Sequence, residues 1–170
     1  MMYKKFLFLV LITLASVSNA QTHKRIWAKS FLHKKAPEIV VAQWINKKPD
    51  TKGKFILLDF WATWCGPCRR VIPKLNHFQE VFSDDLVVIG LSDQNAQALE
   101  LFNSNIQYYH ATDPQKRLKN TYQVTGIPHS VLIDPDGIVQ WEGYPLLEGH
   151  LLTESVIQKL IDDYYAKHNN

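Results

Sequence analysis

The feature that most constrains the fold is a buried-strand pattern that leads directly into two cysteines and then into a helical pattern. Residues 55–60 (FILLDF) form an apolar run interrupted by one acid, Asp59. A short run of this kind is typical of a strand buried on both faces. Residues 67–82 then carry apolar side chains at helical spacing. The sequence therefore predicts a strand, a tight loop and a helix, with Cys65 and Cys68 at the junction.

The rest of the chain alternates between strand and helix patterns. Apolar runs predict strands over residues 39–41, 43–45, 86–91, 130–133 and 138–141. Helical spacing predicts helices over residues 94–105, 114–122 and 153–167. Residues 134–137 (DPDG) have the composition of a hairpin turn. This alternation, ending in a hairpin, predicts an α/β layered domain.

The first twenty residues have the pattern of a secretory signal peptide. Lys4 and Lys5 precede an apolar run over residues 6–15, and small residues stand before the bond from Ala20 to Gln21. The run is shorter than the roughly 20 residues that a membrane span needs, although an uncleaved anchor would share the same pattern. We expect a signal peptide at residues 1–20, an arm or first helix at 21–35 and one domain at 36–170. The mature protein would be periplasmic or secreted, without stable membrane insertion.

Charge is balanced overall but unevenly distributed. Without Lys4 and Lys5 the chain carries 17 basic and 16 acidic side chains, which does not favour a nucleic-acid partner. Residues 21–74 carry 12 basic and 3 acidic groups, whereas residues 75–170 carry 5 and 13. The asymmetry fits either a solvated surface or a basic rim that attracts acidic partners.

The position of the cysteines favours thiol–disulfide exchange. Cys65 precedes the predicted helix, whose N-terminus stabilises a thiolate, and Cys68 follows within one turn, close enough to attack a mixed disulfide at Cys65. Pro67 suits the first turn of a helix, and Gly66 leaves room for the backbone of a partner.

Other roles for the two cysteines have less support. A zinc site would need two further ligands at suitable spacing, and c-type haem attachment would need histidine at position 69, where Arg69 stands. A structural disulfide remains open, although so small a loop constrains the unfolded chain little. We expect no metal and no cofactor other than a redox-active disulfide between Cys65 and Cys68.

Residues 58–68 (LDFWATWCGPC) resemble the active-site segment of the thioredoxin superfamily. Further motifs are similar to its exported TlpA/ResA-type branch, which is related to the AhpC/TSA proteins: APE at 36–38, GIP at 126–128, and LID at 132–134 followed by Gly137. The resemblance implies a thioredoxin fold, in which a central mixed β-sheet is flanked by helices on both faces.

The resemblance also implies roles for residues outside the cysteine pair. Pro128 matches the cis-proline that docks an extended substrate, and Ile127 matches the position that contacts the disulfide. Asp59 matches a buried acid, whose pKa burial would raise, so that it could exchange a proton with Cys68; a purely structural hydrogen bond is the alternative. Trp64 would present an apolar face to substrates beside Gly66 and Pro67.

His129 is a weaker candidate for the same docking groove. The Gly-Pro dipeptide between the cysteines matches that of thioredoxin and favours a reductase acting on protein disulfides. Such an enzyme outside the cytoplasm would need electrons from a membrane thiol donor, and cytochrome c maturation is one task of this branch.

A thiol peroxidase of peroxiredoxin type is an alternative, although Ala62 departs from its Thr-x-x-Cys pattern. The other alternative is a non-catalytic binding module.

Overall fold

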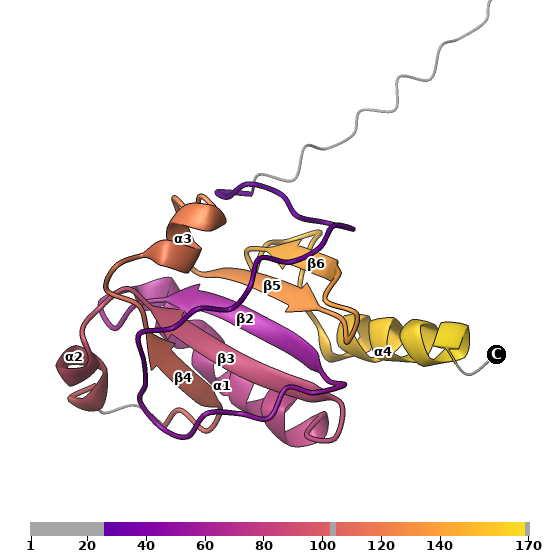
Figure 1. Cartoon of the computed structure of the whole chain (residues 1–170), viewed down its shortest axis with the longest axis horizontal. Helices are drawn as coiled ribbons and strands as arrows, with labels where there is room; N and C mark the ends of the chain where they lie inside the picture. Colours follow the sequence, from indigo (N-terminus) through magenta and orange to yellow (C-terminus); the bar gives the residue numbers. More distant parts are fainter. Residues whose placement is uncertain (1–25, 103–104, 169–170) are drawn as a thin grey trace, which may run out of the picture.

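The computed structural model describes residues 26–102 and 105–168, so the expected signal peptide at 1–20 lies outside the described residues. Six strands of this part form one sheet in the order β1-β4-β3-β2-β5-β6 (Figure 1). The strands are β1 (Gln43–Trp44), β2 (Phe55–Trp61), β3 (Leu86–Ser92), β4 (Tyr109–Thr112), β5 (His129–Ile133) and β6 (Val139–Gly143). The helices are α1 (Gly66–Val81), α2 (Ala96–Glu100), α3 (Arg117–Thr121) and α4 (Glu154–His168). Within the described ranges, no helix is long and apolar enough to cross a bilayer.

The sheet is mixed, and its central strand is the one that leads into the cysteines. β2 pairs in parallel with β3 and antiparallel with β5. This register places Asp59 between Gly90 on β3 and Ser130 on β5. The pairing therefore brings two segments that are distant in sequence, residues 58–68 and 127–130, to the same end of the sheet.

Helices α1 and α4 cover one face of the sheet. Apolar side chains of α1, such as Val71 and Leu75, pack with Ile157 and Ile161 of α4 and with the alternate residues of β2 that include Leu57. The helical spacing of the sequence produces this buried stripe, as expected for a helix lying on a sheet. These contacts fix the N-terminus of α1 at the end of β2.

The opposite face is covered by α3 and by the N-terminal segment, which we define as residues 26–44. Leu118 and Tyr122, at and just after α3, pack on the other set of β2 and β3 side chains, and Phe31 and Ile39 of the N-terminal segment join them. Figure 1 shows this segment crossing in front of the sheet, with α1 behind it. The α/β architecture, with a mixed sheet and helices on both faces, confirms the predicted thioredoxin fold.

Several expected elements differ in the structure. The predicted strand at 39–41 is wrong: Ile39 and Val41 alternate because they pack on the sheet face, not because they join the ladder. No helix forms in the described residues of the arm, 26–35. The helix expected at 94–105 is shorter, Ala96–Glu100; it begins after Asn95, whose side chain caps it by accepting a hydrogen bond from Ala98 N. Strand β4 has no counterpart among the predicted strands, since its pattern rests on Tyr, His and Thr more than on aliphatic residues.

Candidate active site at the N-terminus of α1

The two cysteines form a disulfide at the start of α1. Cys65 is the N-cap residue in an extended conformation, and Cys68 lies in the first turn. The backbone N–H of Cys68 donates to Cys65 Sγ at 3.2 Å, so the first turn directs an amide at the sulfur. Such amides, together with the helix dipole, stabilise a thiolate in the reduced protein. Cys65 is 4% exposed and Cys68 1% exposed, so Cys65 is the more accessible of the two.

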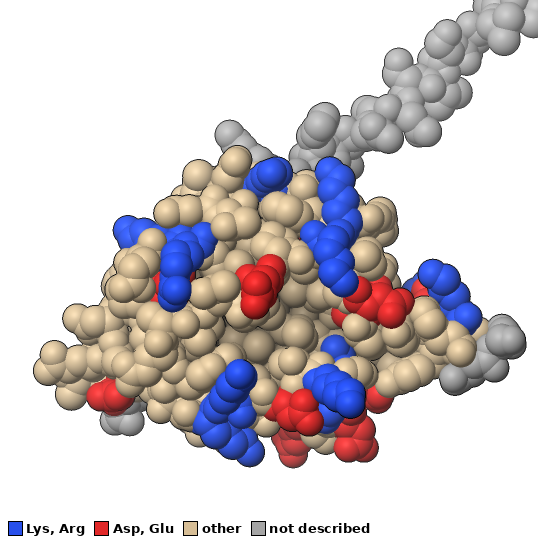
Figure 2. Space-filling view, viewed as in Figure 1, with Lys and Arg blue, Asp and Glu red and all other residues tan. Residues whose placement is uncertain are grey.

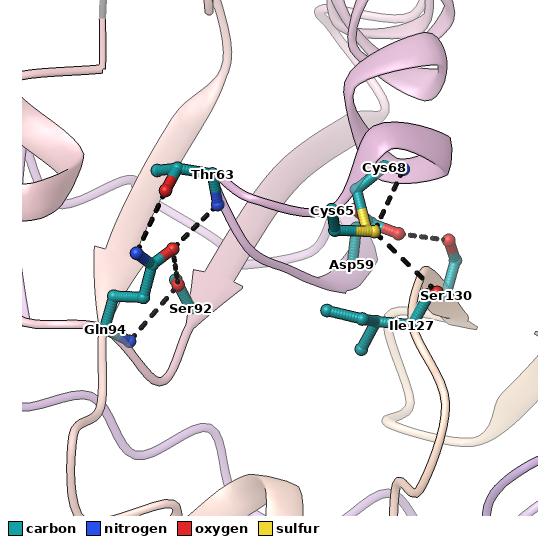
Figure 3. The surroundings of a disulfide bond; sticks show 8 residues. All are labelled: Asp59, Thr63, Cys65, Cys68, Ser92, Gln94, Ile127 and Ser130. Carbon is teal, nitrogen blue, oxygen red and sulfur yellow. Dashed lines mark hydrogen bonds between the residues drawn. A yellow bond between two sulfur atoms is a disulfide. The ribbon is translucent and has the colours of Figure 1, made fainter.

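The cis-proline loop lies against the disulfide. The bond between Ile127 and Pro128 is cis, and Pro128 stands immediately before β5. The carbonyl oxygen of Ile127 lies 3.8 Å from Cys65 Sγ (Figure 3). The structure thus brings Cys65, Ile127 and Pro128 together, as the resemblance implied. Gly66 and Pro67, also expected at this site, are partly exposed beside them.

Asp59 is a buried acid beneath this pair. Its side chain is 1% exposed and accepts a hydrogen bond from Ser130 Oγ at 2.6 Å. Figure 3 shows the Asp59 carboxyl group directed toward the hydroxyl group of Ser130, in the surroundings of the disulfide. Burial raises the pKa of Asp59 to about 7, and the hydrogen bond from Ser130 opposes part of that rise. Asp59 therefore changes its charge near neutral pH.

Two tryptophans before the cysteines have different environments. Trp61 is buried at the end of β2, where its ring packs on Phe102. Gly90 makes this packing possible, because a Cβ there would lie 3.0 Å from Trp61 Nε1. Trp64 is 69% exposed and stands next to Cys65. Only Trp64 of the two offers an apolar surface to a partner.

Two residues that organise the site are not indicated by the sequence pattern. The sequence assigns Ser130 only to a strand, because its contact with Asp59 depends on strand register. It assigns Gln94 to a helix, but the Gln94 side chain accepts from Thr63 N at 2.7 Å and donates to Thr63 Oγ1 at 3.0 Å. Gln94 thereby braces the loop between β2 and Cys65 (Figure 3). Its position just after a predicted strand was the only signal.

His129 does not face a docking groove. It is 2% exposed, its ring packs near Phe60, and burial lowers its pKa to about 4. It is therefore neutral at physiological pH. Across residues 26–102 and 105–168, no group of three or more His, Cys, Asp or Glu side chains is arranged to hold a metal ion.

Comparison with known proteins places this site in a family. The "Thioredoxin-like" family model matches residues 53–139, which include the disulfide and the cis-proline. The thiol-disulfide oxidoreductase ResA of Bacillus cereus is 32% identical over 135 residues, which cover 72% of this chain and 78% of ResA. The thioredoxin-like protein YneN of Bacillus subtilis is 33% identical, and the match spans 54% of this chain and 56% of YneN.

A solved structure gives the same result. A thiol:disulfide interchange protein from a Bacteroides species superposes with a TM-score of 0.58 at 26% identity, covering 65% of this chain and 80% of that one. The fold, the cysteine pair at a helix N-terminus and these relatives agree with one another. The chain belongs to the thioredoxin-like family and is a ResA-type thiol–disulfide oxidoreductase.

Proposed function

We propose that the protein reduces disulfide bonds of other proteins outside the cytoplasm by cycling Cys65 and Cys68 between dithiol and disulfide. The observation that carries this proposal is the cysteine pair at the N-terminus of α1, with the Ile127 carbonyl 3.8 Å from Cys65 Sγ. This arrangement stabilises the Cys65 thiolate and leaves the sulfur of Cys68 within reach of a mixed disulfide at Cys65. The electrons reside in the pair itself, so the reaction needs no dissociable cofactor and no metal.

The reaction balances in two exchange steps. The Cys65 thiolate attacks a substrate disulfide, forms a mixed disulfide and releases one substrate thiolate. Cys68 then loses its proton and attacks Cys65 Sγ, which releases the second substrate thiolate and forms the Cys65–Cys68 disulfide. The substrate gains two electrons and the protein loses two. A thiol donor, which we place in the membrane, must then reduce the pair again.

Substrate docking in this proposal uses the loop that contacts Cys65. A substrate segment lies along Ile127 and Pro128, while Gly66 and Pro67 leave space for its backbone. Trp64 covers its apolar side chains, as exposed tryptophans often do in binding surfaces.

In this proposal Asp59 accepts the proton that the Cys68 thiol loses before it attacks. A buried thiol gives up its proton reluctantly, and a carboxylate next to it can accept the proton directly or through one water. With a pKa of about 7, Asp59 is close to half ionised at neutral pH, which suits a group that both accepts and returns a proton.

The location rests on the signal-peptide pattern of residues 1–20. We propose cleavage after Ala20 and a periplasmic or secreted mature protein. N-terminal sequencing of exported protein should begin at Gln21, and sequence beginning at Met1 would contradict cleavage. Apocytochrome c, whose haem-binding cysteines must be reduced, is one candidate substrate within this proposal.

Trapping tests the assignment of the two cysteines. The Cys68→Ser variant should accumulate a mixed disulfide with insulin through Cys65, whereas Cys65→Ser should accumulate none. The wild-type protein should reduce insulin catalytically with a chemical dithiol as donor. Trapping through Cys68, or by neither variant, would contradict the assignment. Rapid consumption of hydrogen peroxide would instead favour a peroxidase. Unchanged partner binding by a variant that carries both Cys65→Ser and Cys68→Ser would favour a binding module.

A further inference from the structure

A cavity of about 360 Å³ lies between the N-terminal segment and the sheet, on the face opposite α1 and α4. Its floor contains Ile56, Ile89 and Ile133 of β2, β3 and β5. Ile56 is the only residue of β2 that is not buried, although β2 is the central strand. The cavity therefore leaves one residue of this central strand incompletely covered.

The walls of the cavity are apolar, and its rim is basic. Pro37, Ile39 and Trp44 line it from the N-terminal segment, and Lys35 and Lys48 complete the rim. No acidic side chain is among its described lining residues. A small-molecule pocket in a protein commonly has this form, an apolar space of 300–1,000 Å³ with a few polar groups that fix orientation.

The rim lysines have capacity to bind an anion. Lys35 Nζ donates to the carbonyl oxygen of Asp136 at 2.6 Å, which positions the ammonium group and leaves other N–H groups available. Lys48 forms no hydrogen bond or ion pair with any residue in the described ranges. No lysine of residues 26–54 takes part in a described ion pair. Figure 2 shows this face, where basic side chains, and some acidic ones, surround a recessed central area.

We propose that this cavity binds a small amphipathic anion, a medium-chain carboxylate whose chain occupies the apolar space and whose carboxylate pairs with Lys35 and Lys48. The size is consistent: at about 30 Å³ for each atom of water size, the volume accommodates about 12 non-hydrogen atoms, as in decanoate. A concave site suits a free ligand better than a membrane surface, which would need protruding apolar side chains. The inference goes beyond the proposed function, because the cavity contains none of the residues assigned to thiol chemistry.

Calorimetric titration of the purified protein with decanoate and with uncharged 1-decanol tests the proposal. We expect one decanoate per chain, at least tenfold tighter than decanol. Lys48→Gln and Lys35→Gln should each weaken decanoate about fivefold, as for one partly solvated charge pair. Lys52→Gln, a lysine outside the cavity, is the matched control and should bind decanoate as the wild type does.

Substitutions that fill the cavity provide a second test. Ile56→Phe from the floor and Ile39→Phe from the wall should each abolish decanoate binding while insulin reduction stays within twofold of wild type, which also reports folding. No saturable binding up to 5 mM, equal affinity for decanol, or equal loss in Lys52→Gln would overturn the proposal. Concentration-dependent dimerisation that Ile56→Phe removes would assign the cavity to a second copy of the chain and overturn it as well.

Discussion

Replacing Asp59 by asparagine should make the stability of the oxidised protein less dependent on pH. Burial raises the pKa of Asp59 from its ordinary value of 3.8 to about 7. Between these two pH values the folded protein holds a proton that the unfolded chain has lost, so the free energy of unfolding falls as pH rises. A difference of about 3 pKa units corresponds to about 4 kcal/mol at 1.36 kcal/mol per unit. The amide of the Asp59→Asn variant does not titrate, so the variant should show no such loss.

The assay is urea unfolding of wild type and Asp59→Asn at intervals from pH 4 to pH 9, with the disulfide intact so that neither cysteine titrates. Other ionisable groups cancel in the difference between the two proteins. The variant should gain stability relative to wild type as pH rises, by about 4 kcal/mol in total, with little further change above pH 8. A difference that does not depend on pH would refute a buried acid with a raised pKa.

Three further substitutions test the surroundings of the pair. Ser130→Ala removes the hydrogen bond that favours the carboxylate, so the pKa of Asp59 should rise further, and the pH midpoint of mixed-disulfide resolution should rise with it. Trp64→Ala should raise KM for insulin about tenfold with kcat within twofold, because an exposed apolar contact is lost. Gln94→Ala should lower the free energy of unfolding by about 1–3 kcal/mol, because the N–H of Thr63 loses its acceptor.

The first two of these outcomes have a control, and the third has a result that would contradict it. The Ser130→Ala shift should vanish in the Asp59→Asn background, and a shift that persists there would show that Ser130 acts on another group. Leu101→Ala, at another exposed apolar residue, should leave KM unchanged; an equal effect would remove the special role of Trp64. Unchanged unfolding of Gln94→Ala would show that the loop does not depend on the brace.

The sequence predicted the elements that are long or continuously apolar. β2 and β3 are buried on both faces and appear as apolar runs, and α1 and α4 are long enough to show helical spacing. β1, two residues long, falls within the strand predicted at residues 43–45, whereas the four residues of β4 offer too few alternations to reveal it. β4 lies between β1 and β3 in the sheet, so this short strand depends on pairing with segments that its own pattern does not indicate.

Contacts of the site between residues close in sequence were predictable, and contacts between residues distant in sequence were not. Cys65 and Cys68 lie within one turn, so their spacing alone placed them together. The contact between Asp59 and Ser130 spans 71 residues and follows from the antiparallel register of β2 and β5. The resemblance indicated that residues 127 and 128 approach the cysteines, but it did not indicate which hydroxyl group would face the acid.

The reduction potential of the Cys65–Cys68 pair tests the central claim most directly. Purified protein would be equilibrated against defined dithiol buffers, and the fraction of disulfide measured by thiol labelling. Our account predicts a value near that of thioredoxin, about −270 mV. A value near that of the strong oxidant DsbA, about −120 mV, differs by about 7 kcal/mol and would contradict reduction as the direction. A pair that never cycles would contradict thiol–disulfide exchange altogether.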